Sequence, residues 1–268
     1  AAADVYKRQA MYTVYAFCHE VDDTVDHPPP GTNPREQLSQ WRQEIKAMYQ
    51  GAPKYPATIS LAAHARNLNI PESYLQELVT GMEMDLMNTR YATFDDLYPY
   101  CYRVASIVGL ICLKVFGTQD PRAKDYAINL GVAFQLTNIL RDVGADANRQ
   151  RIYLPQEDLA HFNYSEQQLL EKKESAQFLE LMKFQAKRAH EFYEKAQAAY
   201  ETLSRKDRQS LLAAEIMRGI YFRILTRIQT SNYAVFGPRI SLSPAHRILI
   251  ALYTWLRTSL INRFTSQP

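Results

Sequence analysis

The sequence predicts an all-α fold, and three observations support this prediction. Apolar residues recur with helical spacing nearly from end to end of the 268 residues. Proline-rich stretches divide the pattern into segments of helical length. The chain has only nine glycines, whereas strands joined by tight turns need more of them. No repeat, low-complexity tract or change of composition marks a boundary, so we expect one domain over residues 1–268.

The expected helices follow this punctuation along the chain. Pro71 and Pro121 suit the first turn of a helix, where a missing N–H costs little. The segment "RIYLP" marks a loop that ends at Pro155, ahead of a long charged helix. The helices are expected at about 8–26, 35–50, 57–67, 72–90, 94–117, 121–145, 165–203, 207–233 and 244–264.

The composition limits the possible functions of the protein and indicates its cellular compartment. The net charge of +3 is too small to indicate a nucleic-acid partner. Three cysteines, an odd number, lie in apolar segments, which is typical of reduced thiols in a cytosol (Cys18, Cys101 and Cys112). No stretch reaches the ~18 uninterrupted apolar residues of a membrane span, and the start of the chain lacks the features of a signal peptide. We therefore expect a cytoplasmic protein.

Two acidic stretches carry most of the functional information. They are "FCHEVDDTVD" (17–26) and "QLTNILRDVGAD" (135–146). Asp22 and Asp26 lie four residues apart, as do Asp142 and Asp146, so each pair shares one face of a helix. Oxygen ligands on two facing helices suit Mg²⁺, which typically takes one or two carboxylates plus substrate phosphates. We predict that the two faces hold Mg²⁺ and clamp a diphosphate between them.

Polar neighbours extend both faces. Tyr15 and His19 precede the first pair in helical register, and Gln135 and Asn138 precede the second. A lone D-x-x-x-D is more often a solvated helix face than a metal site. Here both pairs continue from helices too apolar for a surface, which favours the metal site. A histidine ligand is an alternative role for His19, although a lone histidine is more often a hydrogen-bonded bystander.

Four segments resemble the signatures of squalene/phytoene synthases. "YAFCHEVDDTVD" and "GVAFQLTNILRDVGADANRQRIYLP" resemble the two aspartate-rich blocks of that family. "YCYRVASIVG" and "AAEIMRGIYFRIL" resemble two further blocks, and the likeness runs from about residue 8 to the end. Within the family, "VASIVG" and "AAEIM" are most similar to bacterial presqualene diphosphate synthases of hopanoid biosynthesis.

The resemblance implies a single isoprenoid-synthase domain around a central cavity, in which two prenyl diphosphates are joined head to head. Asp22 and Asp26 would bind Mg²⁺ with the first diphosphate, and Asp142 and Asp146 would bind it with the second. Further matching positions are the substrate contacts and the reaction-centre tyrosines, namely Tyr15, His19, Gln135, Asn138, Arg151, Tyr100, Tyr153 and Tyr221. The carbocation formed needs an apolar, water-poor cavity, for which Phe17, Val104, Val108, Leu110 and Phe134 are candidates.

The sequence departs from the family pattern in three places. His19 stands where relatives carry arginine, and Ala145 stands where they carry an acidic residue. The family's helix before residue 8 is missing or replaced by "AAADVY". The first and third departures affect the site of the first diphosphate.

The main functional expectation is condensation of two farnesyl diphosphates to presqualene diphosphate. The alternatives are a phytoene synthase acting on two geranylgeranyl diphosphates, a full squalene synthase that also uses NADPH, and an inactive diphosphate-binding scaffold. The segment "HRILIALYTWLRTSLINRF" mixes apolar residues with Arg247, Arg257 and Arg263. Such a segment suits peripheral contact with a membrane, but a packed last helix is the favoured interpretation. The sequence does not indicate an oligomeric state.

Overall fold

A computed structural model describes residues 2–264, with side chains from residue 4 to residue 258. Within that range the chain forms helices joined by loops and no strand, so the all-α prediction is confirmed. The elements are α1 (Ala2–Asp26), α2 (Pro34–Tyr49), α3 (Pro56–Asn67), α4 (Glu72–Met87), α5 (Phe94–Cys101), the π-helical turn η1 (Tyr102–Ser106), α6 (Ile107–Phe116), α7 (Ala123–Asn148), α8 (Gln156–His161), α9 (Glu166–Leu170), α10 (Ala176–Glu201), α11 (Arg205–Ser210), α12 (Leu212–Thr230) and α13 (Pro244–Phe264).

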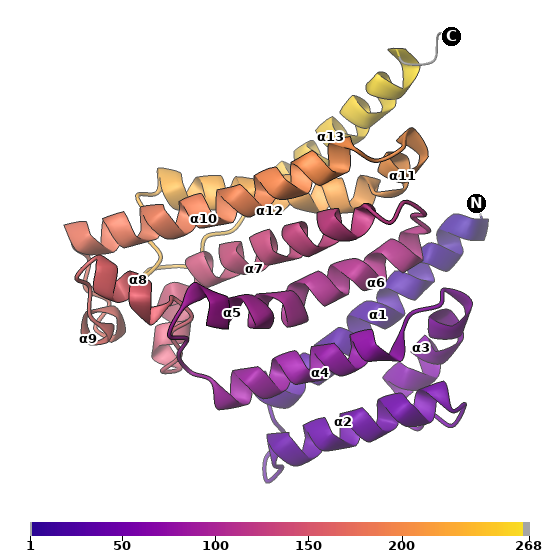
Figure 1. The fold of residues 1–268 in the computed structure, drawn as a ribbon, viewed down its shortest axis with the longest axis horizontal. Coiled ribbons are helices and arrows are strands. Elements are labelled where there is room, and N and C mark those ends of the chain that lie inside the picture. The colour runs from indigo at the N-terminus through magenta and orange to yellow at the C-terminus, as the bar shows by residue number, and fades with distance from the viewer. Residues whose placement is uncertain (1, 265–268) are drawn as a thin grey trace.

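The helices stack in layers around α7 (Figure 1). α10 packs along α7 on one side, with α12 beside it, and η1 and α6 pack on the other side. α4 and α1 form the next layer, and α2 and α3 lie outermost. α4 and α6 each contact α1, while η1 and α6 contact α7, so these elements connect the two helices that carry the acidic segments.

Two glycines of α7 allow close backbone contacts that shape the site. A Cβ at Gly131 would lie 2.5 Å from Cα of Ser106, so only glycine lets η1 approach α7 this closely. A Cβ at Gly144 would lie 2.7 Å from the carbonyl oxygen of Val235. The loop after α12 therefore runs directly over the acidic part of α7.

Three expected helices differ from the observed ones: one contains a π-helical turn and two are divided. The expected helix 94–117 is continuous but contains the π-helical turn η1, and π-turns frequently occur at functional sites. The expected helix 165–203 is split, because Lys172 adopts a φ of +56° and Ser175 caps a new helix, α10. Ser204 likewise caps the short α11, which ends before α12 begins. The short α8 was not expected at all.

The segment Phe94–Phe116 is long and apolar enough to cross a membrane by length and composition alone. It packs against α4 and α7 inside the bundle, which is typical of a core helix in a soluble protein. Its hydropathy is therefore weak evidence for a membrane span.

The last helix, α13, packs on α12 and projects from the body (Figure 1). Its outer side exposes six large apolar side chains by between 49% and 67%, namely Ile248, Leu249, Leu252, Tyr253, Trp255 and Leu256. This differs from the expectation of an ordinary packed helix, because these apolar side chains lie in solvent. The side chain of Arg263 lies outside the described residues.

Candidate active site

The two aspartate pairs face a common acidic centre. Asp22 is partly open to solvent, yet desolvation and then the charges of Asp26 and Asp85 raise its pKa to about 6. On α7, burial and then the charges of Asp142 and Asp85 raise the pKa of Asp146 to about 7. Because Asp85 of α4 acts on both pairs, the three helices direct their carboxylates toward one space.

Arg151 links the first pair to this centre. Its Nη1 lies 3.2 Å from Oδ1 of Asp26 and 3.2 Å from Oδ2 of Asp85. The chain folds back after α7 because Gln150 adopts a φ of +58° and the N–H of Arg151 donates to the carbonyl of Asp146. Sequence analysis assigned Arg151 to substrate binding, and the structure places it between α1, α4 and α7.

Asp142 is held by two arginines. Arg141 donates to both carboxylate oxygens at 2.9 and 2.5 Å, and Arg239 donates to both at 2.9 Å. Burial raises the pKa of Asp142, but the hydrogen bonds from the two guanidiniums outweigh burial and lower it below its usual value. Asp142 is therefore an anion whose charge is already paired, in contrast to Asp146.

Three tyrosine rings stack beside Asp85. The ring centroids of Tyr100 and Tyr153 are 5.3 Å apart, and Tyr91 lies 6.2 Å from Tyr153. Burial keeps the pKa of all three hydroxyls above the usual value, so they stay protonated. Tyr221 lies apart from this group on α12, where its ring stacks on Phe134 at 4.3 Å. The structure thus brings together two of the three predicted tyrosines.

An apolar cavity of about 250 Å³ opens beside Asp22. It is lined by side chains of α1, α4, η1 and α6, including Leu78, Met82, Val104 and Val108. Two of the expected wall residues, Val104 and Val108, therefore line it. The others do not: Phe17 and Leu110 are buried core residues, and Phe134 contacts Tyr221.

Tyr15 and His19 lie at the rim of this cavity. Both are exposed, and their rings stack at 5.9 Å. Nε2 of His19 lies 3.4 Å from Oδ2 of Asp23, so the imidazole pairs with the aspartate that points away from the predicted metal face. His19 is thus near Asp22, but its side chain contacts Asp23.

The side-chain oxygen of Asn138 accepts no hydrogen bond from the described residues. Its Nδ2 donates to Oε1 of Gln135 at 3.3 Å, while its Oδ1 is buried and has no hydrogen-bond partner among the described residues. An orphaned buried acceptor of this kind calls for an explanation such as an ion or a water molecule. It lies one helical turn before Asp142, where the second metal face was predicted.

The donor set fits Mg²⁺, although no three Asp, Glu, His or Cys side chains of the described residues converge closely enough to hold an ion alone. Mg²⁺ needs only one or two carboxylates, because substrate phosphates and water complete its octahedron. Among the described residues, no cation forms an ion pair with Asp22 or Asp146, and Oδ1 of Asn138 has no hydrogen-bond partner, so these oxygens are available to a metal. When bound, Mg²⁺ would act as a Lewis acid that neutralises charge on a leaving diphosphate.

Sequence analysis missed four residues of this site: Asp85, Tyr91, Arg141 and Arg239. Asp85 had a signal, since it and Glu83 are the two carboxylates in the otherwise largely apolar run "VTGMEMDLM". Arg141 directly precedes Asp142 in the sequence, so its pairing with that carboxylate was also predictable. Arg239 comes from a loop 97 residues away in sequence, and no local pattern pairs it with Asp142.

An all-helical bundle with facing acidic helices, stacked tyrosines and an apolar cavity defines an isoprenoid-synthase type of enzyme. The chain belongs to the squalene/phytoene synthase family, whose pattern matches residues 3–246. It is therefore a prenyltransferase of the kind that joins prenyl diphosphates head to head, which confirms the resemblance noted from sequence.

Two similar proteins named phytoene synthases support the assignment to this family. A phytoene synthase of Arthrospira platensis is 39% identical over 87% of this chain and 79% of its own length. A 15-cis-phytoene synthase of Synechocystis sp. is 37% identical over 95% of this chain and 78% of its own.

Solved structures agree as well. A dehydrosqualene synthase bound to a ligand superposes with a TM-score of 0.83 at 30% identity, over 95% of this chain and 88% of its own. A squalene synthase of Alicyclobacillus acidocaldarius has a TM-score of 0.77 at 24% identity, over 85% of each chain, and shows the shared fold.

Proposed function

We propose that this enzyme joins two geranylgeranyl diphosphates head to head to form phytoene, with Mg²⁺ as the required metal. The relatives that are 37% to 39% identical are named phytoene synthases, which supports the C20 substrate over the farnesyl diphosphate expected from short motifs. This proposal replaces presqualene diphosphate formation as the leading interpretation.

The observation that carries the proposal is that two carboxylates of the acidic centre, Asp22 and Asp146, form no ion pair among the described residues. The pKa values of Asp22 and Asp146 are raised to about 6 and about 7, since each carboxylate is desolvated and faces other carboxylates. Such a site favours the binding of divalent cations, and a diphosphate can complete their coordination. Arg151 and Arg239, now paired with aspartates, supply donors for phosphate oxygens when the metal takes over those carboxylates.

The tyrosines and the apolar wall suit the cationic intermediate of such a condensation. Tyr100 and Tyr153 are buried and neutral, so they present electron-rich rings without a charge that would react. Val104 and Val108 keep water away from the cavity, and water would quench an allylic cation.

A C30 product from two farnesyl diphosphates is the second candidate. The likeness to a dehydrosqualene synthase, at 30% identity and a TM-score of 0.83, supports it. A full squalene synthase reaction would further require NADPH as the reductant.

Product analysis distinguishes these reactions. The purified protein is incubated with each labelled diphosphate and Mg²⁺, with and without NADPH, and the lipid extract is separated by chromatography. We expect a C40 hydrocarbon from geranylgeranyl diphosphate and at least about tenfold less product from farnesyl diphosphate. The reverse ratio would favour the C30 reaction, and no product from either would favour an inactive scaffold.

We further propose a cytoplasmic enzyme that contacts a membrane surface through α13, because its substrates and product are lipids. The exposed apolar side chains of α13 and the absence of acidic residues in this helix support such contact. Vesicle sedimentation of a Leu252→Ser/Trp255→Ser variant tests it, and unchanged sedimentation relative to wild type would reject α13 as the contact.

A further inference from the structure

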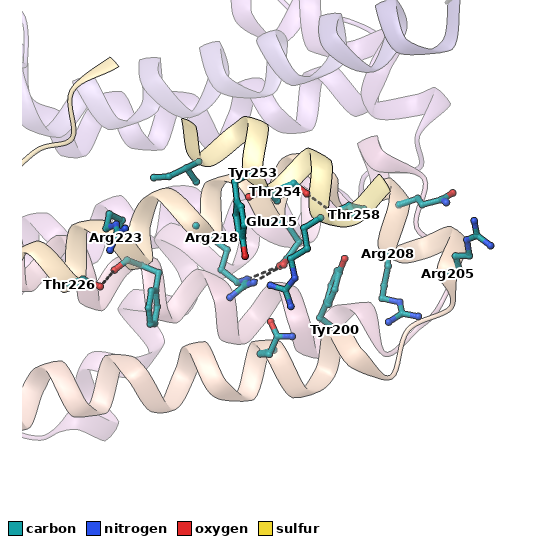
Figure 2. Close-up of a pocket in the computed structure, with 16 residues that line it drawn as sticks. Tyr200, Arg205, Arg208, Glu215, Arg218, Arg223, Thr226, Tyr253, Thr254 and Thr258 are labelled. Atoms are coloured by element: carbon teal, nitrogen blue, oxygen red, sulfur yellow. Dashed lines mark hydrogen bonds and ion pairs between the residues drawn. The ribbon is translucent and has the colours of Figure 1, made fainter. Parts of the chain in front are cut away.

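A second large pocket lies away from the acidic centre, between the end of α10, α11, α12 and α13 (Figure 2). Its volume is about 550 Å³, and none of its lining residues takes part in the site described above. The proposed function does not use it.

The pocket is strongly basic. Five arginines and one glutamate line it, namely Arg205, Arg208, Arg218, Arg223, Arg257 and Glu215. They give the pocket a net charge of +4, whereas the whole chain has +3, so the rest of the molecule is net negative by one charge. The excess of positive over negative charge in this protein is therefore located at this pocket.

The single carboxylate of the pocket is already satisfied. Glu215 is buried and accepts hydrogen bonds from the hydroxyl of Tyr126 at 2.9 Å and from Nε and Nη2 of Arg218 at 2.8 Å each. Among the described residues, no carboxylate forms an ion pair with Arg208, Arg223 or Arg257. Three guanidiniums thus remain available for an anion.

Tyr200 lines the same pocket, and Figure 2 shows it next to Arg208. Burial is the main cause that raises the pKa of its hydroxyl, and the nearby charges of Arg208, Arg218 and Arg257 act in the opposite direction. The Tyr200 side chain therefore lies within electrostatic reach of three arginines from three different helices. Its neutral hydroxyl is a further donor for an anion.

Apolar side chains stand beside the cations. Phe222, Ile250 and Tyr253 line the same pocket, and Phe222 and Tyr253 are 38% and 67% exposed. α13 comes close to α12 at Gly219, where a Cβ would lie 2.8 Å from Cγ2 of Ile250. An aromatic and aliphatic wall next to free guanidiniums suits a ligand with an anionic head and an apolar chain.

We propose that this pocket is a second anion site, which binds the phosphate or diphosphate group of an amphiphile. Arg208 and Arg257 bind the phosphate oxygens, since a guanidinium fork matches that geometry. The apolar chain lies against Phe222 and Tyr253. The ligand comes either from solution, as a free prenyl diphosphate, or from an anionic phospholipid of a membrane on which α13 rests.

The test uses the full chain in EDTA, so that the acidic centre holds no metal. The variant is Arg208→Gln/Arg257→Gln, and the control with the same loss of charge is Lys187→Gln/Lys206→Gln, whose lysines are exposed and do not line the pocket. One arm measures geranyl diphosphate binding by calorimetry. The other compares sedimentation with phosphatidylglycerol and phosphatidylcholine vesicles.

We expect about tenfold weaker binding by the arginine variant in at least one arm, and binding by the lysine control equal to wild type. Loss in the calorimetry arm identifies a free prenyl diphosphate, and loss with phosphatidylglycerol vesicles alone identifies a lipid. Equal binding of the arginine and lysine variants in both arms overturns the proposal. Arg257→Gln alone, at an exposed position, repeats the test if the double variant does not fold.

Discussion

The hydroxyl of Tyr153 donates a hydrogen bond to Oδ1 of Asp85 at 2.5 Å, while Arg151 reaches Oδ2 of the same carboxylate at 3.2 Å. One buried aspartate of α4 therefore holds two residues of the loop that follows α7. Burial raises the pKa of Asp85 despite these two partners, so the carboxylate is kept in an environment that penalises its charge. Because Arg151 also bonds Asp26, this arrangement ties the loop after α7 to both α4 and α1.

We expect Asp85→Ala to lower kcat by about tenfold or more and to destabilise the fold by about 1–3 kcal/mol, because a buried tyrosine and an arginine lose their partner. Asp85→Asn, which still accepts from Tyr153, should have an intermediate effect. Asp158→Asn is the control, since Asp158 is equally buried and bonds Arg188 at 2.6 Å but lies outside the site. Steady-state kinetics and thermal unfolding measure both effects. Wild-type kcat in Asp85→Ala would show that Asp85 does not position the loop.

The metal-free protein should lose stability as the pH rises from about 4 to 7. Asp22 and Asp146 have folded-state pKa values of about 6 and about 7, above the ordinary value of an aspartate, so the folded state binds more protons than the unfolded state in this window. One pKa unit of such a shift corresponds to about 1.4 kcal/mol. Asp146→Asn should therefore raise the melting temperature of the metal-free protein at pH 8, and Mg²⁺ should stabilise the wild type there. A difference in melting temperature between Asp146→Asn and the wild type that does not grow with pH in EDTA would contradict this account.

Arg239→Gln should weaken diphosphate binding while it makes Asp142 easier for Mg²⁺ to reach. Arg239 is largely exposed and donates two hydrogen bonds at 2.9 Å to Asp142, so its removal leaves the core intact. We expect KM for the prenyl diphosphate to rise about tenfold and the Mg²⁺ concentration at half activity to fall. Arg227→Gln is the control. Arg227 is an exposed residue of α12, and within the described residues its guanidinium donates only to the backbone carbonyl of Ser241, which lies in the same loop as Arg239. Equal KM values for the two variants would exclude a diphosphate contact by Arg239.

Val108→Phe should shift the substrate preference toward shorter chains. Val108 lines the cavity beside Asp22, and a larger side chain shortens the space for the prenyl tail. We expect kcat/KM for geranylgeranyl diphosphate to fall at least about tenfold more than kcat/KM for farnesyl diphosphate. Val108→Ala should change the ratio in the opposite direction. A constant ratio in both variants would place the prenyl tail elsewhere.

Helix positions were largely predictable, because an apolar period and proline or serine punctuation are local features of the sequence. The boundaries that failed depended on tertiary context. Whether Ser175 and Ser204 cap new helices or lie inside longer ones is decided by what the following turns pack against. The π-helical turn η1 likewise lies at a tertiary contact, since its Ser106 packs closely on Gly131 of α7.

The site was predictable where function requires a repeated pattern on one helix, as for Asp22 with Asp26 and for Asp142 with Asp146. It was not predictable where distant segments meet. The contacts of Asp85 with Tyr153 and of Asp142 with Arg239 join residues 68 and 97 positions apart, and single residues carry no mark of such partners. His19 lies on the predicted face, at the rim of the cavity beside Asp22, and its contact with a diphosphate stays a prediction.

The central claim is that both aspartate pairs act together through Mg²⁺ to join two prenyl diphosphates. The most direct measurement is the rate of C40 product formation from geranylgeranyl diphosphate as Mg²⁺ is titrated, for the wild type, Asp22→Ala and Asp142→Ala. Circular dichroism shows that each variant keeps its helices. The account predicts Mg²⁺-dependent product from the wild type and a rate at least about 100-fold lower from either variant at saturating Mg²⁺. Product formation in EDTA, or near-normal turnover by either folded variant, would contradict it.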